Sequence, residues 1–272
     1  MIEKVNPSHP DKLADRIASV IVDYAYKKEK DPKIAVEVLL GHSECKIIIE
    51  SNVDFTYNEI YTLVHKIIRY EDIHIEFTLV KQDEHLANNQ KEEIKCGDNG
   101  IFRGVPLTEE DKLLSKISKE IYINYECDGK YILTKDKLIV CQSNATNDEL
   151  LQLIKDKFRD ELGDRKIIIN PLGYWTGGYN VDTGATNRKL GSDMAKSVTG
   201  GGLWGKDFSK ADVSVNIYAF LKAQQTQKEV ELYCAIGDTE IDGRPYSEIV
   251  DIAKNYVNSL GGFEKFSEWG LF

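Results

Sequence analysis

Residues 33–51, Lys-Ile-Ala-Val-Glu-Val-Leu-Leu-Gly-His-Ser-Glu-Cys-Lys-Ile-Ile-Ile-Glu-Ser, decide the fold class of this chain. Two apolar runs, 33–40 and 45–51, are joined by the short polar link Gly41-His42-Ser43-Glu44. Apolar and β-branched residues bounded by such a link predict two neighbouring strands. Other elements of the chain must therefore pack against the apolar face of this strand pair.

Helical patterns flank the strand pair on both sides. Over residues 10–29, apolar side chains recur every three to four positions from Leu13 to Tyr24, which predicts an amphipathic helix. A second helix is expected over 57–69, and the apolar run 74–80 predicts a third strand. The first unit thus reads strand, strand, helix, strand, with helices available to cover one sheet face.

The same order recurs along the chain. Strands 120–127 and 131–141 are expected on either side of the hairpin signal Asp128-Gly129, followed by helix 147–161 and strand 166–169. A less complete copy has helix 208–224, strand 229–236 and helix 246–259. The recurrence predicts an α+β fold of three similar sheet-plus-helix units in a pseudo-threefold arrangement, with helices on one face of each sheet. The approximate units are an N-terminal unit 1–104, a central unit 105–185 and a shortened C-terminal unit 186–272, between which the chain can cross.

Composition narrows the class of protein. The 272 residues carry a formal net charge of −10, which argues against a general nucleic-acid binder. No apolar run approaches the roughly 20 residues that a membrane span needs, and the first residues lack the pattern of a signal peptide. The five cysteines are scattered and include no Cys-x-x-Cys pair, which favours a reducing, cytoplasmic location over a structural zinc site.

Residues 200–212, Gly-Gly-Gly-Leu-Trp-Gly-Lys-Asp-Phe-Ser-Lys-Ala-Asp, carry the strongest chemical signal. Successive glycines leave backbone N–H groups open to an oxyanion. If a helix begins near Asp207, Lys206 and Lys210 lie on one face of its N-terminal end, which itself favours anions. Asp207 and Asp212 add oxygen ligands that suit Mg²⁺. The segment predicts a site for a metal-bound polyphosphate, with a glycine-rich turn before a solvated helix as the open alternative.

Other polar residues allow both a functional and a structural interpretation. His9 is expected at the N-cap of the first helix, where it either contacts phosphate or caps the helix. Glu37 and Glu50 interrupt apolar strands and either meet a ligand or face solvent. Trp175 either stacks on a base or packs in its loop, and the Arg188 guanidinium suits phosphate oxygens.

Taken together, these motifs resemble those of the methionine adenosyltransferase (S-adenosylmethionine synthetase) family. The resemblance runs from His9 to about Gly237, in a chain shorter than typical members. The matching segments are His9-Pro10-Asp11-Lys12, Glu37, Glu50, Gly97-Asp98-Asn99-Gly100, Ile169-Asn170-Pro171-Leu172-Gly173, Arg188-Lys189 and 200–212. Departures include Tyr174 in place of an arginine and Thr199 in place of a histidine.

The resemblance implies a role for each of these residues. His9 would contact the oxygen between C5′ of ATP and the triphosphate, and Trp175 would stack on adenine. The implied catalytic residues are His9, Lys119, Arg188, Lys206 and Lys210. The implied substrate-binding residues are Lys12, Glu50, Gln82, Asp98, Trp175, Asp182 and Lys189. The implied metal ligands are Asp11 and Asp212 for Mg²⁺ and Glu37 for K⁺.

The reaction that the resemblance implies joins ATP and L-methionine. The sulfur of methionine attacks C5′ and displaces triphosphate, which is then cleaved to pyrophosphate and phosphate. The resemblance also implies a homo-oligomer, at least a homodimer, with the active site at the subunit interface and no nucleic-acid or membrane partner. Segment 82–96 would be a mobile loop over the site. Two alternatives stay open: a catalytically silent ATP-binding regulatory homologue, and an adenosyltransferase for a methionine analogue.

Overall fold

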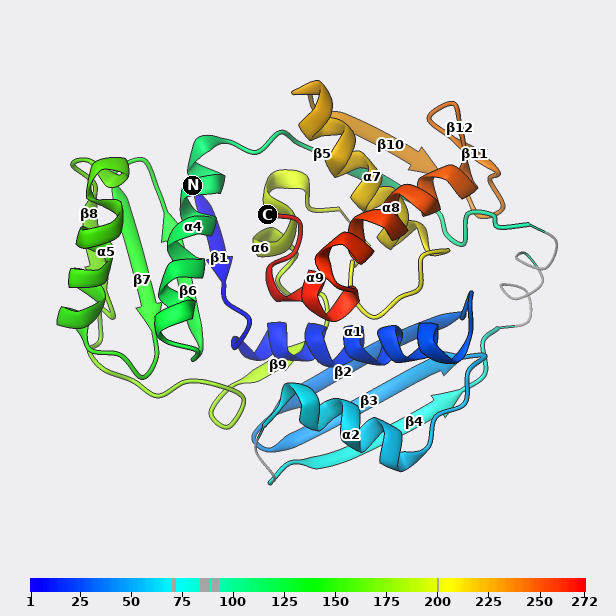
Figure 1. Cartoon of the computed structure of the whole chain (residues 1–272), viewed down its shortest axis with the longest axis horizontal. Coiled ribbons are helices and arrows are strands. Elements are labelled where there is room, and N and C mark those ends of the chain that lie inside the picture. Colours follow the sequence, from blue (N-terminus) through cyan, green and yellow to red (C-terminus); the bar gives the residue numbers. More distant parts are fainter. Residues whose placement is uncertain (70–71, 84–88, 90–92, 200) are drawn as a thin grey trace.

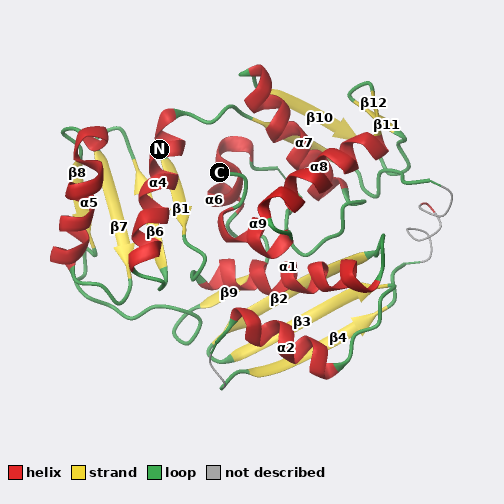
Figure 2. Ribbon diagram, viewed as in Figure 1, coloured by secondary structure: helices red, strands yellow, loops and turns green. Residues whose placement is uncertain are grey.

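A computed structural model describes residues 1–69, 72–83, 89, 93–199 and 201–272. Helices and strands are mixed along the chain, and they form two four-stranded sheets and two strand pairs (Figures 1 and 2). The predicted α+β class is therefore confirmed. The described residues include no helix long and apolar enough to cross a membrane.

The first sheet has the strand order β4-β3-β2-β9. Its strands are β2 (Ile34–Gly41), β3 (Glu44–Ser51), β4 (His74–Val80) and β9 (Thr183–Ala185). Strands β2 and β3 are antiparallel, and β4 returns parallel to β3 after a helical crossover. The helices α1 (Pro10–Lys28) and α2 (Tyr57–Ile67) cover one face, as Figure 1 shows. Side chains alternate between that buried face and an exposed one, which leaves the second face of the sheet open.

The second sheet has the order β1-β6-β7-β8 and packs against two helices. Its strands are β1 (Ile2–Val5), β6 (Gly129–Leu133), β7 (Lys137–Gln142) and β8 (Lys166–Ile169). The helices are α4 (Glu109–Asn124) and α5 (Asn147–Leu162). The strand order places the first residues of the chain in the sheet of the central segment, where Ile2 lies opposite Leu133.

The remaining elements belong mostly to the C-terminal third of the chain, and the last helix among them packs against α1. They are β5 (Gly100–Gly104), α6 (Leu190–Met194), the 3₁₀ turn Ala195–Ser197, α7 (Ala211–Thr226), β10 (Val230–Cys234), β11 (Glu240–Ile241), β12 (Arg244–Pro245), α8 (Tyr246–Leu260) and α9 (Phe263–Trp269). Strands β5 and β10 are antiparallel, as are β11 and β12. One apolar core runs through the first sheet and these C-terminal elements, whereas the second sheet has a core of its own. The unit boundaries at 104 and 185 stay a prediction.

Two sequence predictions of secondary structure are wrong, and a third has the wrong first residue. The expected strand 120–127 largely coincides with the end of α4, which a capping box at Thr108 begins and which buries Leu114, Ile117 and Ile121. Apolar side chains spaced three to four residues apart are typical of a helix. The short alternation of apolar and polar residues at the end of α4 instead resembles a strand, which explains the wrong prediction. The expected strand 131–141 is two strands joined by a turn, β6 and β7. The expected helix 208–224 begins only at Ala211.

Candidate active site

Two charged segments lie along one edge of strand β2. At one end of this edge, β9 pairs with residues 39–41, and the Thr186 N–H donates to the Val38 carbonyl at 3.1 Å. At the other end, the Val36 N–H donates to the Gly205 carbonyl, and Lys206 forms a bridge with Ala35. The sheet edge therefore brings together the segments after Asp182 and after Gly201, which are separate in the sequence.

Asp11 is the centre of a charged cluster at the start of α1. Its carboxylate is 2% exposed and accepts a hydrogen bond from the Ala185 N–H at 2.9 Å. The Lys189 Nζ lies 2.7 Å and the Arg188 Nε 3.5 Å from its two oxygens. Burial of a carboxylate is tolerated when cations and hydrogen-bond donors surround it in this way. Helix α1 and the segment after β9 thus place one carboxylate and two cations in contact.

His9 occupies the N-cap of α1, as predicted from the sequence. Its Nδ1 accepts a hydrogen bond from the Asp11 N–H at 3.2 Å, so in the neutral ring the proton is on Nε2. Burial lowers the pKa of His9 to about 4, against the opposing charge of Asp11 and with a further contribution from Lys189. His9 is therefore a neutral imidazole at pH 7, with Nε2–H free of this internal bond.

Asp128 and Lys130 are additional residues near this cluster. Burial raises the pKa of Asp128 to about 6, and its Oδ2 accepts from the Gly178 N–H at 3.1 Å. Lys130 is close enough to His9 to lower the pKa of the imidazole. The sequence pattern predicts Asp128 only as part of a hairpin, together with Gly129. The sequence Asp-Gly-Lys could have indicated that these residues belong to the site, because it places a carboxylate and an ammonium two residues apart beside a tight turn.

Lys206 and Asp212 form an ion pair at the beginning of α7. A Cβ atom at Gly201 would lie 1.8 Å from the Asp212 Oδ1, so only glycine leaves room for this carboxylate. Lys210 is the N-cap residue of α7 and is partly exposed. The helix therefore starts three residues later than expected, and Lys206 reaches its first turn from the preceding loop. Gly200 lies outside the described residues.

The open face of the first sheet carries two of the predicted acidic residues. Glu37 accepts a hydrogen bond from the Thr186 hydroxyl, next to the segment that holds Arg188. Glu50 lies opposite Val80 in the parallel register, and Gln82 follows Val80 by two residues at the same end of the sheet. Of the predicted loop 82–96, residues 84–88 and 90–92 lie outside the described residues.

Several predicted residues lie apart from the two charged clusters. The Lys12 ammonium is buried between Asp193 at 2.7 Å and Asp15 at 3.2 Å. Lys119 lies near the ring of Trp269, and burial lowers its pKa.

Asp98 is exposed in the turn before β5. Trp175 is partly buried, and its indole N–H donates to the Asn170 side chain at 3.1 Å. The functions predicted for Lys12, Lys119, Asp98 and Trp175 stay predictions.

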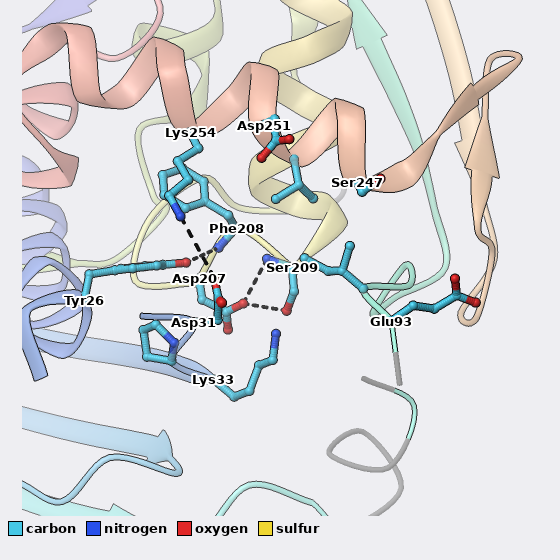
Figure 3. A pocket seen from close by; sticks show the side chains of 13 residues that line it. Tyr26, Asp31, Lys33, Glu93, Asp207, Phe208, Ser209, Ser247, Asp251 and Lys254 are labelled. Carbon is cyan, nitrogen blue, oxygen red and sulfur yellow. Dashed lines mark hydrogen bonds and ion pairs between the residues drawn. The ribbon is translucent and has the colours of Figure 1, made fainter. Parts of the chain in front are cut away.

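Asp207 faces a different cavity, of about 400 Å³, between α1 and α8 (Figure 3). One of its oxygens accepts from the Ile34 N–H at 2.9 Å, and the other accepts from the backbone N–H and the hydroxyl of Ser209. These bonds attach the loop before α7 to β2. Asp207 thus holds this loop in place, and Asp212 is the carboxylate next to Lys206.

Within the part of the chain that the structure describes, no group of three or more His, Cys, Asp or Glu side chains is arranged to hold a metal ion. The donors at the predicted positions do suit the predicted cations. Asp11 and Asp212 offer carboxylate oxygens, which Mg²⁺ prefers, and lysines now neutralise both. Glu37 and the Thr186 hydroxyl offer oxygens on the open sheet face.

Comparisons with known proteins indicate the enzyme class to which this chain is similar. A family model described as the S-adenosylmethionine synthetase N-terminal domain matches residues 1–91. The chain thus resembles the methionine adenosyltransferase family as a shortened member, and the enzyme class predicted from its motifs is confirmed.

Individual relatives agree with this class. The S-adenosylmethionine synthase of Mycoplasma capricolum is 27% identical over 78% of this chain and 68% of its own length. That of Helicobacter pylori is 26% identical over 97% of this chain and 83% of its own length. An unusual S-adenosylmethionine synthetase from Campylobacter jejuni has the same fold, with a TM-score of 0.82 at 19% identity, and covers 99% of this chain and 93% of its own.

Proposed function

We propose that this chain synthesises S-adenosylmethionine from ATP and L-methionine. The methionine sulfur attacks C5′ of ATP and displaces triphosphate, and the triphosphate is then cleaved to pyrophosphate and phosphate. The cluster of His9, Asp11, Arg188 and Lys189 at the start of α1 is the observation that carries this proposal. It combines a neutral hydrogen-bond donor with two cations where negative charge would develop on a leaving triphosphate.

The residues of the cluster suit stabilisation of a leaving triphosphate better than general-base catalysis, in which a side chain removes a proton from the nucleophile. A thioether sulfur carries no proton, so the attack needs no general base. Because its Nδ1 accepts from the Asp11 N–H, His9 can donate from Nε2 to the oxygen that leaves C5′. Arg188 and Lys189 would bind phosphate oxygens, and Lys206 and Lys210 would extend the positive charge along the β2 edge.

Other residues would position the two substrates. Glu50 and Gln82 lie at one end of the first sheet and would bind the methionine amino and carboxylate groups. Trp175 would stack on adenine, while Asp98 and Asp182 would contact substrate hydroxyl or amino groups. Lys12 and Lys119 are the least direct of the proposed contacts, because Lys12 is buried with two carboxylates and Lys119 lies beside Trp269. Alignment of sulfur with C5′ would add to the rate through orientation.

Magnesium and potassium belong to the same proposal. Asp11 and Asp212 would hold Mg²⁺, and Glu37 would hold K⁺. A bound Mg²⁺ would neutralise charge on the polyphosphate oxygens. In that state Lys189 and Lys206 would be released from their carboxylate partners and become available to phosphate.

We further propose a homo-oligomer whose subunits meet on the open face of the first sheet. This face exposes large apolar side chains, Leu39 at 51% and Ile48 at 57%, beside Glu37 and Glu50. Contact there would place the active site at the subunit interface. A cytoplasmic location, a role in one-carbon metabolism and the pseudo-threefold relation between the three units are parts of the same proposal.

The test is to incubate the purified protein with ATP, methionine, Mg²⁺ and K⁺ and to detect S-adenosylmethionine by mass spectrometry. Lys189→Met should lower kcat by about 100-fold or more, because it removes one of the cations that would stabilise the leaving triphosphate. Lys112→Met is the matched control, because Lys112 is an exposed lysine paired only with nearby Glu109. Equal activity of both variants would contradict the phosphate assignment.

The products separate the remaining alternatives. Pyrophosphate and phosphate together with S-adenosylmethionine support the full reaction, whereas intact triphosphate would show that hydrolysis is lost. ATP binding without product would favour the silent regulatory homologue. Turnover with a methionine analogue alone would favour an adenosyltransferase of different specificity.

A further inference from the structure

Two buried cysteines meet where the segment before β5 contacts the end of β10. Their sulfur atoms lie 3.1 Å apart, although 138 positions separate Cys96 from Cys234 in the sequence. Each sulfur atom also lies within hydrogen-bonding distance of the backbone carbonyl of Asp98, at 3.1 Å for Cys96 and 3.4 Å for Cys234. The two sulfur atoms therefore point at each other, and a hydrogen bond already joins them.

The backbone on both sides of the pair is held by further hydrogen bonds. The Cys96 N–H donates to the Asp238 carbonyl at 2.9 Å, and the Gly237 N–H donates to the Cys96 carbonyl at 2.8 Å. The Ile236 N–H donates to the Asn99 side chain at 2.8 Å. A disulfide has an S–S distance of about 2.05 Å, so the sulfur atoms have to approach by about 1 Å. Side-chain rotation and a small shift of either loop can supply this approach.

We propose that Cys96 and Cys234 form a reversible disulfide that attaches the Asp98 segment to β10 when a peroxide oxidises the protein. Hydrogen peroxide is small enough to reach a buried thiol after a local opening. The pair differs from Cys45, whose burial in β3 raises its pKa to about 12. For Cys96 the hydrogen bond with Cys234 is the largest effect, and it lowers the pKa of the Cys96 thiol.

Oxidation proceeds in two steps. The Cys96 thiolate attacks one oxygen of hydrogen peroxide, so an S–O bond forms, the O–O bond breaks, and hydroxide leaves and becomes water. The Cys234 sulfur then attacks the sulfenic sulfur of Cys96, the S–S bond forms, and hydroxide leaves with the Cys234 proton as a second water. The two sulfur atoms lose two electrons in total to one peroxide, and a dithiol reductant reverses the change.

The crosslink would act on the segment that carries Asp98. Both sulfur atoms contact the Asp98 carbonyl, so drawing them together changes the turn that presents the Asp98 side chain. An effect on catalysis rests on the proposed function, in which Asp98 contacts substrate. Formation of the disulfide does not, because it depends only on this chain and a peroxide.

The test is to treat the intact protein with hydrogen peroxide and measure its intact mass, and then to block free thiols and identify disulfide-linked peptides. We expect the wild type to lose two hydrogen atoms in mass and to give one linked peptide pair containing Cys96 and Cys234. Dithiothreitol should restore the original mass. The disulfide should also raise Tm by several degrees, because it closes a long loop.

Two kinds of variant make the test specific. Cys96→Ser and Cys234→Ser should each abolish the linked peptide, whereas Cys127→Ser and Cys141→Ser should leave its yield unchanged. The proposal is overturned if the linkage forms without Cys96 or Cys234, or if the wild type gives only sulfinic acid or stays reduced. Because this readout needs no substrate, it separates failure of the disulfide from failure of the proposed enzyme activity.

Discussion

Replacing Lys12 with methionine should destabilise the protein rather than weaken substrate binding alone. The Lys12 ammonium lies 2.7 Å from Asp193 and 3.2 Å from Asp15, and all three side chains are at most 1% exposed. It also lies 4.5 Å from the centroid of the Trp204 ring, whose N–H donates to Asp193 at 2.9 Å. Methionine fills a similar volume but leaves the buried Asp193 carboxylate without its cation.

The cost follows from the burial of the network. Removing one partner of a buried ion pair costs about 3–5 kcal/mol, because a charge is left without compensation. For a chain of this size, about 1 kcal/mol lowers Tm by about 2–4 °C, so the expected decrease is about 6–20 °C. Adding Asp193→Asn to Lys12→Met should restore part of the loss, because it removes the uncompensated charge while an amide oxygen can still accept from Trp204.

Thermal unfolding followed by circular dichroism, together with kcat and KM for both substrates, is the assay. Lys112→Met is the control, since its ammonium is half exposed and its loss should change Tm by less than about 2 °C. A Lys12→Met protein that melts with the wild type but has a raised KM for ATP or methionine would refute this reasoning. It would instead support the substrate-binding role that the family resemblance implies.

Three further predictions test the site and its support. Burial raises the pKa of Asp15 from 3.8 to about 8, so the folded state binds a proton that the unfolded state has lost. The free energy of unfolding should therefore fall as pH rises from about 4 to 8. Melting curves measured over this pH range should show a flatter dependence for Asp15→Asn. Because the pKa of His9 is about 4, kcat/KM should show no inflection from this histidine between pH 6 and 8, and an inflection that His9→Asn removes would contradict its neutral state. Gly201→Ala places a Cβ 1.8 Å from the Asp212 Oδ1 and should lower activity more than tenfold, roughly the loss of one stabilising contact. Gly191→Ala, whose added Cβ would lie 4.0 Å from the Val198 side chain, should leave activity unchanged.

Local sequence patterns predict three strands of the first sheet and its two helices well. The helix expected over 10–29 is α1, and the strands expected over 33–40 and 45–51 are β2 and β3, each within about one residue at either end. These signals lie within a few neighbouring residues, as does the His9 cap. Side-chain periodicity and capping therefore determine them before any long-range contact forms.

Pairing between distant segments could not be predicted in the same way. Strands β1, β5 and β9 are three to five residues long and find their partners far along the chain. The pairing of β1 with β6 brings Asp128 and Lys130 close to His9, and nothing near His9 in the sequence indicates this. For the same reason the sequence does not indicate that Lys12 pairs with Asp193, which is 181 residues away, and a role of Lys12 in substrate binding stays a prediction.

The position of β1 also has a consequence for the order of folding. A chain made from its N-terminus exposes Ile2–Val5 long before Lys130–Leu133, with which these residues pair. The Lys4 ammonium is buried only when the carbonyl oxygens of Ser192 and Trp269 surround it. Contacts that span most of the chain slow folding, because loop closure must precede them. Strand β1 is thus synthesised well before its partners and finds its place late, and a chaperone that protects this segment during synthesis should raise the yield of folded protein.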